Sequence, residues 1–280
     1  MNLIKLSTSN KTKEAGYQVY KKCLIWKGMP DHEKLLSPTE AKSIIKSTGA
    51  WMLRNIYDWN CEEGTNFWIL IKEPHSSFEY GKKTRKYIEK ANNRFNFEII
   101  SRKKLEEEGY KVYKAAFDHY KVNDGFLRDE SGYIKSIEKI EESIDIWGAV
   151  DKESGKLEAY SLCNRIGDTV DFQASKANPE FLSKYYVMYG LYDARNRYYL
   201  EEKKCRYVVT SARSITNHSN IQSFMIEKFG FKKVYCKMKV HYVFWFKWLI
   251  DCFYPFRSFV KWRPLQNILK LEEINRELKK

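Results

Sequence analysis

The segment that decides the fold is IDIWGAVDKESGKLEAYSLCNRIGDTVDFQAS, residues 144–175. Three runs of mostly aliphatic, aromatic and β-branched residues are separated there by two turn signals, KESGK at 152–156 and IGDT at 166–169. The glycines in these short polar stretches supply the backbone conformations that hairpin turns need. The segment therefore predicts a meander of three antiparallel strands.

Helices and further strands are predicted on both sides of this meander. Toward the C-terminus, a long helix at 180–204 is followed by a strand at 205–212, a helix at 221–229 and a strand at 231–244. Toward the N-terminus, a short strand begins at Asn96 and is followed by amphipathic helices at 102–121 and 131–143. This order predicts an α/β fold in which helices flank a mixed, mostly antiparallel central sheet.

Composition divides the chain into three predicted regions. Residues 1–94 are lysine-rich and form a basic α/β extension, with one clear strand at Asn66–Glu73 and a basic helix at 80–95. Residues 95–245 carry the alternating order and form the main domain. Residues 246–280 form a helical tail that is rich in aromatic and basic residues.

The charge and the cysteines limit the possible partners. The 280 residues include 50 Lys and Arg against 36 Asp and Glu, and the net charge of +14 favours anionic partners such as tRNA or an acidic membrane surface. The six cysteines form no CxxC pair and no zinc-type pattern with the five histidines, so no metal site is expected. The N-terminus lacks a signal peptide, which predicts a cytoplasmic chain with reduced thiols.

Two stretches resemble a known superfamily. SNIQSFMIEKFGF (219–231) and the following KKVYCKMKV (232–240) resemble the late helix and strand of the GCN5-related N-acetyltransferase (acyl-CoA N-acyltransferase) fold. FWILIKE (67–73) and GKKTRKYIEKA (81–91) resemble the Fem-like branch, which includes aminoacyltransferases of peptidoglycan bridges and relatives in bacterial surface-glycan synthesis. The resemblance implies transfer of an acyl or aminoacyl group to an amine of a sugar or lipid-linked cell-envelope precursor.

The sequence departs from that family where the acyl donor binds. Members that use acetyl-CoA carry a glycine-bearing loop before the long helix, whose backbone N–H groups hold the pyrophosphate. Here the matching stretch SKANPEFLSKYYVMYG (175–190) has no glycine before Gly190. Lys176, Ser183 and Lys184 are the predicted substitutes. The donor is therefore expected to be acyl-CoA or aminoacyl-tRNA, with no tightly bound cofactor.

Asp171 is a candidate catalytic residue on the third strand of the meander. Strict alternation divides residues 169–175 into a polar and an apolar face: Asp171, Gln173 and Ser175 against Val170, Phe172 and Ala174. In the resembling fold this strand separates from its neighbour at the acyl site. Asp171 would act there as a base or orient the amine. The alternative is a polar residue on an exposed strand face.

Arg213 and His218 are the other candidate catalytic residues. Both follow the strand at 205–212, at the end where open α/β sheets place ligands. His218 would move a proton near neutral pH, and Arg213 would hold a phosphate or carboxylate. Asn220 and Gln222 match the resembling family as donor-binding residues. Alternatively, Ser219 and Gln222 form a capping box that only begins the helix.

The tail has two possible roles. The segment 241–262 combines tryptophan and phenylalanine with Lys247, Arg257 and Lys261, a composition that suits peripheral contact with the inner face of an anionic membrane. Lys247, Asp251 and Pro255 make it a poor transmembrane span. The alternative is a helix packed on its own domain.

Two functions are compatible with these features. The first is an N-acyltransferase in which His218 moves protons, Arg213 holds an anion and Asp171 positions the amine. The second is a catalytically silent protein that binds RNA or an anionic membrane surface, which the missing phosphate-loop glycines and the net charge of +14 would also suit.

Overall fold

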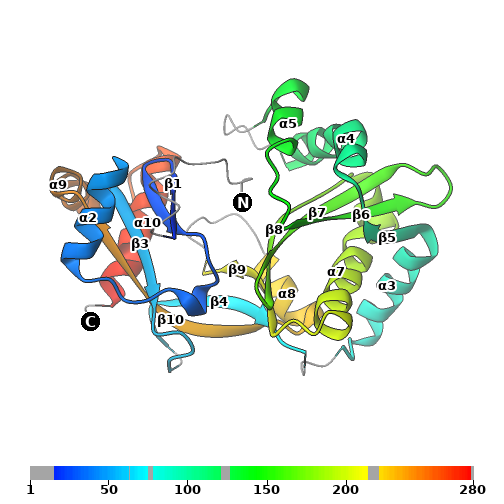
Figure 1. The fold of residues 1–280 in the computed structure, drawn as a ribbon, viewed down its shortest axis with the longest axis horizontal. Coiled ribbons are helices and arrows are strands. Elements are labelled where there is room, and N and C mark those ends of the chain that lie inside the picture. The colour runs from blue at the N-terminus through cyan, green and yellow to red at the C-terminus, as the bar shows by residue number, and fades with distance from the viewer. Residues whose placement is uncertain (1–15, 63, 75–77, 121–126, 214–220, 279–280) are drawn as a thin grey trace. The chain divides into compact units, whose positions relative to one another are not determined.

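The computed structural model describes residues 16–62, 64–74, 78–120, 127–213 and 221–278 (Figure 1). Within these ranges ten strands follow the hydrogen-bonded order β1-β2-β3-β10-β4-β9-β8-β7-β6-β5. The fold is α/β, with a mixed sheet flanked by helices, which confirms the predicted class. The chain divides into two compact units, and each is described by itself. Unit 1 holds residues 71–210 and 221–232, and unit 2 holds the remaining described residues.

Unit 1 is built on the predicted meander. Its strands are β5 (Phe95–Ile99), β6 (Ile144–Asp151), β7 (Leu157–Ile166), β8 (Thr169–Ala177) and the first part of β9 (Tyr207–Ala212). Neighbouring strands from β5 to β8 pair antiparallel, whereas β9 pairs parallel with β8. The helices are α3 (Lys82–Arg94), α4 (Arg102–Tyr120), α5 (Glu130–Ile137), α6 (Glu180–Lys184), α7 (Val187–Arg197), which a π-helical turn extends through Tyr198–Glu202, and α8 (Ile221–Phe229).

The two faces of the unit 1 sheet are covered by different helices. On one face α4 packs on β7 and β8, and Leu162 and Tyr160 of β7 join the core beneath α4 and α5. On the other face α7 packs on β5, β6 and β7, and α3 packs against α7. Figure 1 shows α4 and α5 on one side of these strands and α3 and α7 on the other. Successive residues of β7 therefore face different helices.

Unit 2 contains elements that the sequence did not reveal. They are β1 (Tyr17–Tyr20), β2 (Cys23–Trp26), a 3₁₀ turn (Pro30–His32), α2 (Pro38–Thr48) and β3 (Met52–Tyr57). Most of β10 (Lys232–Tyr242), α9 (Phe244–Phe253), a 3₁₀ turn (Tyr254–Phe256) and α10 (Arg263–Glu277) complete the unit, and β4 (Phe67–Lys72) runs from unit 2 into unit 1. A capping box between Ser37 and Glu40, with Pro38 in the first turn, begins α2, and Gly49 ends it.

Side-chain hydrogen bonds join the parts of unit 2 that are distant in sequence. Asn66 donates from Nδ2 to the carbonyls of Met238 (2.8 Å) and Ile274 (3.0 Å). The buried carboxylate of Glu272 accepts from Tyr242 Oη (2.8 Å) and pairs with Arg276 (2.9 Å). These contacts attach α10 to β10 and to the loop before β4.

Two predicted helices are wrong in part. The helix predicted through 143 ends at Ile137, because tight turns carry the chain from there, with Ile140 N–H donating to the Ile137 carbonyl, and Ile144 already begins β6. The turns keep Ile140 buried, so apolar spacing alone could not reveal them. The long helix predicted at 180–204 breaks at Tyr186, whose left-handed backbone (φ 56°) separates α6 from α7.

Candidate functional site

The pairing between strands β8 and β9 ends partway along β8. Their parallel ladder pairs Thr169 with Tyr207 and ends where Asp171 pairs with Val209. Yet β8 continues to Ala177, still paired with β7. The edge of β8 after Asp171 therefore has no ladder partner in β9. Backbone N–H and C=O groups on such an edge need other hydrogen-bond partners, which a ligand can supply.

A bulge lies at the point of separation and corrects the predicted alternation. Cys163 pairs with Phe172 and Leu162 pairs with Ala174, so Gln173 is an extra residue on β8. The extra residue puts Phe172 and Ser175 on the same face, toward α7, although strict alternation predicted opposite faces. Ala174 packs into the core on the α4 side. A bulge is set by strand pairing, so the sequence of β8 alone could not show it.

The residue beneath this face is Arg195 of α7, which sequence reasoning missed. Its side chain is 1% exposed, and Nη1 donates to Ser161 Oγ and, at 3.3 Å, to Ser175 Oγ. The guanidinium lies 3.9 Å from the ring centroid of Phe172 and 4.5 Å from that of Tyr192. No carboxylate pairs with it among the described residues, and its Nε has no hydrogen-bond acceptor there.

The electrostatics of Arg195 make the site unusual. Burial lowers the pKa of the guanidinium, but an arginine remains protonated in proteins, so a positive charge is held in the interior. Two neutral hydroxyls and two aromatic faces compensate a buried charge only in part. Such a site can stabilise a carboxylate, or an oxyanion that forms during a reaction.

Cys163 neighbours the same cluster but is not a nucleophile at neutral pH. Its Sγ lies 3.9 Å from Ser161 Oγ, and burial raises the pKa of the thiol to about 11. The thiolate, which is the reactive form, is therefore scarce at neutral pH. The cluster offers positive charge and hydroxyl groups rather than covalent chemistry.

The first turn of α7 lies beside an aromatic ring of α3. Tyr186 stacks on Tyr87 of α3 with ring centroids 3.6 Å apart, and Tyr189 N–H donates to the Tyr186 carbonyl. A Cβ on Gly190 would lie 2.2 Å from Phe97 Cζ and 2.9 Å from Ala91 Cβ. Gly190 is therefore needed for close helix packing, not for holding a phosphate.

The three predicted donor-binding residues near α6 are dispersed. Lys176 lies on β8, on the α4 side, with Nζ 4.9 Å from the Phe117 ring centroid, and burial lowers the pKa of its amine. Lys184 lies over the ring of Tyr185, and Ser183 is exposed on the same short helix. Their role as donor ligands stays a prediction.

The predicted catalytic residues fall in different parts of the chain. Asp171 occupies the last paired position before β8 and β9 separate. Arg213, in unit 2, forms a two-bond ion pair with Glu277 of α10 (2.6 and 3.0 Å) and donates to the Asn66 carbonyl (2.6 Å). His218 and Asn220 lie outside the described residues, and Gln222 lies in the first turn of α8. Their roles stay predictions.

A second polar cluster in unit 1 was also missed. Lys72 is fully buried, donates from Nζ to the Phe229 carbonyl at the end of α8 (2.9 Å), and lies 4.5 Å from the Phe78 ring centroid. Burial lowers the pKa of its amine to about 8, and burial raises the pKa of Asp193 in a neighbouring pocket of about 260 Å³. Its bond to a terminal helix carbonyl indicates that Lys72 caps α8.

Metal sites and membrane spans are not found in the described ranges. No group of three or more His, Cys, Asp and Glu side chains there could hold a metal ion. None of the helices in these ranges combines the length and the apolar character that crossing a bilayer requires.

Comparisons with known proteins place the fold. No family model and no curated protein sequence matches the chain. Among solved structures, FemX matches with a TM-score of 0.51 and 10% identity, over 73% of this chain and 75% of FemX. L-PGS from Bacillus licheniformis also matches, with a TM-score of 0.47 and 11% identity, over 73% of this chain and 72% of L-PGS. A tandem GNAT protein of the clavulanic acid biosynthesis pathway matches with a TM-score of 0.40 and 12% identity, over 73% of this chain and 68% of that protein. The chain has the fold of FemX.

Proposed function

We propose that this protein transfers an acyl or aminoacyl group to an amine, and that the transfer takes place where β8 separates from β9. The observation that carries the proposal is the buried, carboxylate-free Arg195 directly beneath the separated part of β8. The fold shared with FemX supports the reaction class. Binding of RNA or a membrane without turnover would not require a buried positive charge at this position.

The proposed mechanism uses the chain's own charges and hydroxyls. The acyl carbonyl lies along the free edge of β8 after Asp171, where backbone N–H groups donate to its oxygen. When the amine attacks, this oxygen becomes an oxyanion, and the positive charge of Arg195 stabilises it with Ser175 as the intervening hydroxyl. The amine loses its proton to Asp171 or His218, and the leaving group receives a proton as the tetrahedral intermediate collapses.

Aminoacyl-tRNA is the donor that these features favour over acyl-CoA. Residues 175–189 contain no glycine that would let a pyrophosphate approach the backbone before α7, and the net charge of +14 suits a nucleic acid. The acceptor in this proposal is an amine on a sugar or lipid-linked cell-envelope precursor. The resemblance to the Fem-like branch supports that choice.

A donor comparison tests the proposal. The purified chain is incubated with an amino-sugar acceptor and, separately, acetyl-CoA or a mixture of charged tRNAs, and the acylated acceptor is measured by mass spectrometry. We expect product with charged tRNA, and a loss of about 10²-fold in whichever of Asp171→Asn and His218→Ala removes the proton acceptor. Absence of product with every donor would exclude the proposal.

Arg213 needs a matched control because its side chain already binds Glu277. If Arg213 only holds α10, Glu277→Gln should reproduce the loss of stability in Arg213→Ala, and neither should change the activity of the folded protein. If Arg213 holds a substrate anion, only Arg213→Ala should raise KM.

A further inference from the structure

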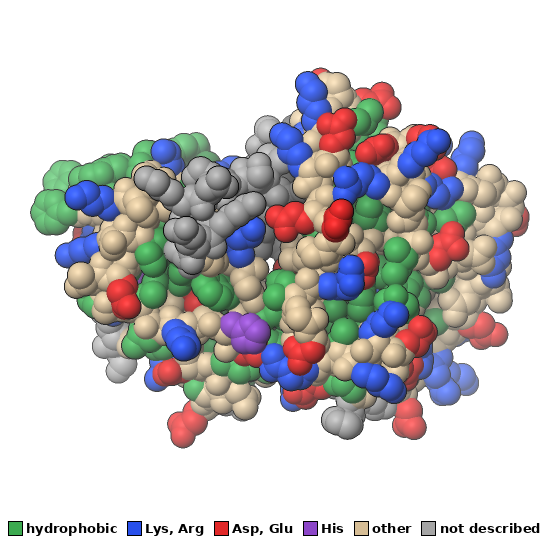
Figure 2. Space-filling model, viewed as in Figure 1, with side chains coloured by type: hydrophobic (Ala, Val, Ile, Leu, Met, Phe, Trp, Pro, Cys, Tyr) green, Lys and Arg blue, Asp and Glu red, His purple; other side chains and the backbone are tan. Residues whose placement is uncertain are grey.

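Unit 2 displays a group of aromatic side chains that its own fold does not cover. We call it the aromatic belt: Phe244, Trp245, Trp248, Phe253, Phe256, Phe259 and Trp262. Their exposed fractions range from 42% for Phe253 to 89% for Phe244. Figure 2 shows hydrophobic side chains gathered at the edge of the molecule where Figure 1 labels α9. An exposed apolar patch of this kind marks an interaction site.

The belt residues of α9 are exposed because the opposite side of this helix packs against the rest of unit 2. Phe246 and Ile250, one helical turn apart, are 6% and 0% exposed. Phe246 packs on Trp51 at 5.4 Å between ring centroids, and Lys247 pairs with Asp251 and Glu272. Since these contacts fix the inner side of α9, Trp245 and Trp248 must project outward.

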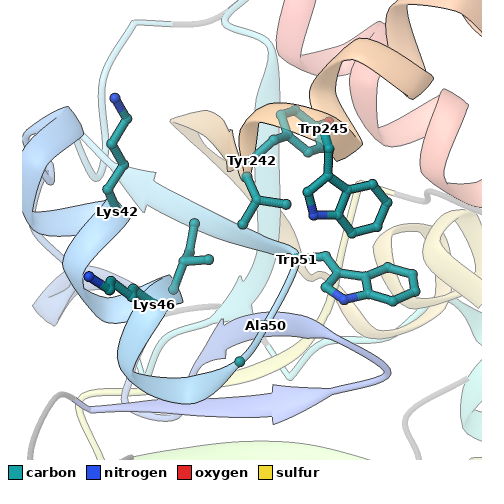
Figure 3. Close-up of a pocket in the computed structure, with 9 residues that line it drawn as sticks. Lys42, Lys46, Ala50, Trp51, Tyr242 and Trp245 are labelled. Carbon is teal, nitrogen blue, oxygen red and sulfur yellow. The ribbon is translucent and has the colours of Figure 1, made fainter.

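A pocket with two lysines adjoins the belt. It has a volume of about 290 Å³ and lies between the end of α2 and the start of α9. Lys42 and Lys46, one turn apart on α2, stand on one side, and Trp51 and Trp245, which pack edge to face at 5.1 Å, stand on the other (Figure 3). Among the described residues that line the pocket, none is acidic. In Figure 3 both ammonium groups point away from the tryptophans, and these exposed, flexible side chains can turn to bind an anionic group at the pocket.

The segment that carries the belt is positively charged, as are the two lysines of the pocket. Residues 244–263 contain four basic side chains and one acidic side chain, Asp251. Lys247 and Arg276 both pair with Asp251, and Arg257 lies 3.7 Å from Glu273 of α10. Lys261 stands within the belt sequence, close to Phe259 and Trp262. The belt therefore combines aromatic surface with net positive charge.

We infer that the aromatic belt and the Lys42–Lys46 pocket form a docking surface for an anionic lipid bilayer. The tryptophan and phenylalanine side chains enter the boundary between headgroups and acyl chains, where aromatic residues are favoured. Lys42 and Lys46 receive the phosphate of an anionic headgroup, and Arg257 and Lys261 meet the negative surface potential. The inference does not depend on the proposed acyl transfer.

The charge argues against a second copy of this chain as the occupant. A two-fold dimer through the belt would bring the same patch from both copies together, and with it two sets of like charges. An anionic bilayer offers the opposite charge over an extended area. Self-association is therefore an outcome of the test that would overturn the inference.

Vesicle binding of the full chain tests the inference, with neither donor nor acceptor present. Vesicles contain either phosphatidylcholine alone or phosphatidylcholine with roughly 30% phosphatidylglycerol. We expect binding to the anionic vesicles, with a blue shift of tryptophan fluorescence as belt residues leave water. High salt should weaken binding to them. Equal binding to both vesicle types, or no binding, would overturn the inference.

Two double variants separate the aromatic and the cationic parts. Trp248→Ser with Phe259→Ser should abolish the blue shift and reduce binding at least tenfold. Lys42→Gln with Lys46→Gln should reduce binding to anionic vesicles about tenfold or more and leave weak binding to neutral vesicles unchanged. Circular dichroism melting verifies that both variants fold.

A matched control lies in unit 1. Tyr120 and Lys103 on α4 are also exposed, so Tyr120→Ser with Lys103→Gln should leave vesicle binding unchanged. A loss of binding equal to that of the belt variant would show a general surface effect and overturn the inference. A dimer in light scattering that only the belt variant dissociates would assign the surface to a second copy.

Discussion

Aromatic side chains have opposite placements in the two units. In unit 1 they form the interior: Tyr133, Tyr160 and Tyr199 are at most 2% exposed. In unit 2 the aromatic belt stands in solvent. Of the twelve large hydrophobic side chains that are exposed in the described ranges, nine belong to unit 2. Unit 2 buries aromatic residues too, among them Tyr17 and Phe67, but among the described residues it alone also displays a group of them to solvent.

The difference separates two tasks. Rings buried in unit 1 surround Arg195 and exclude water from it, which strengthens the field of a fixed charge. Rings exposed on unit 2 surround no buried charge and are suited to binding an external surface. We propose that unit 1 carries the chemistry and unit 2 the attachment, and three substitutions test that division.

The largest effect is expected from Arg195→Met. Activity in the donor assay should fall about 10³-fold, mainly in kcat, because the charge that stabilises the oxyanion is lost. The free energy of unfolding should stay equal or rise, since a buried charge is replaced by an apolar chain and Ser161 and Ser175 still bond each other at 2.9 Å.

The controls for this variant are Arg195→Lys and Arg206→Met. Arg195→Lys keeps the charge and should recover part of the activity. Arg206 is exposed and pairs with Asp168, so its loss should change neither quantity. If Arg195→Met unfolds the protein and spares the activity of the folded fraction, Arg195 serves packing alone.

Gly190→Ala should have the next largest effect. The new Cβ would overlap Phe97 and Ala91, so the free energy of unfolding should fall by about 2 kcal/mol in urea titration. Phe97→Leu shortens the overlapping ring and should recover part of the loss in the double variant. An unchanged stability in Gly190→Ala would mean that α7 is not pressed onto the aromatic interior of unit 1.

The smallest effect is expected from His241 in unit 2, on the decrease of the free energy of unfolding as the pH falls. Burial lowers the pKa of His241 from 6.5 to about 4, so the unfolded chain takes up a proton first as the pH falls. Stability should therefore decrease between pH 6.5 and 4, by about 1 kcal/mol after allowance for partial exposure. His241→Gln should remove this share of the pH dependence, whereas the exposed His119→Gln in unit 1 should not.

The sequence predicted most of the elements of unit 1 and few of those in unit 2. The meander at 144–175 has clear turn glycines, and helix α8 has a clear glycine stop at Gly230. The strands β1 to β3 are short, and β3 pairs with the distant β10, so local pattern carries little information about them. The capping box of α2 at Ser37 and Glu40 is a signal that could have been found.

The candidate site was predictable only in its location. The end of β8 and Asp171 followed from the resemblance, but Arg195 looks like an ordinary surface residue in ARNRYY (194–199). Its hydrogen bond to Ser175 depends on the bulge at Gln173, which turns Ser175 toward α7. Both features arise from pairing between strands. A single sequence does not record such pairing.

The long-range bonds of Asn66 have a consequence for biosynthesis. Its partners Met238 and Ile274 lie 172 and 208 residues further along the chain. At a translation rate of about 5–20 residues per second, roughly 10–35 s pass between the synthesis of β3 and the synthesis of its partner β10. Residues 71–210 of unit 1 are contiguous and can fold in that interval. Until β10 arrives, the edge of β3 that it will cover is open in the nascent chain, which makes this strand a natural place for a chaperone to bind.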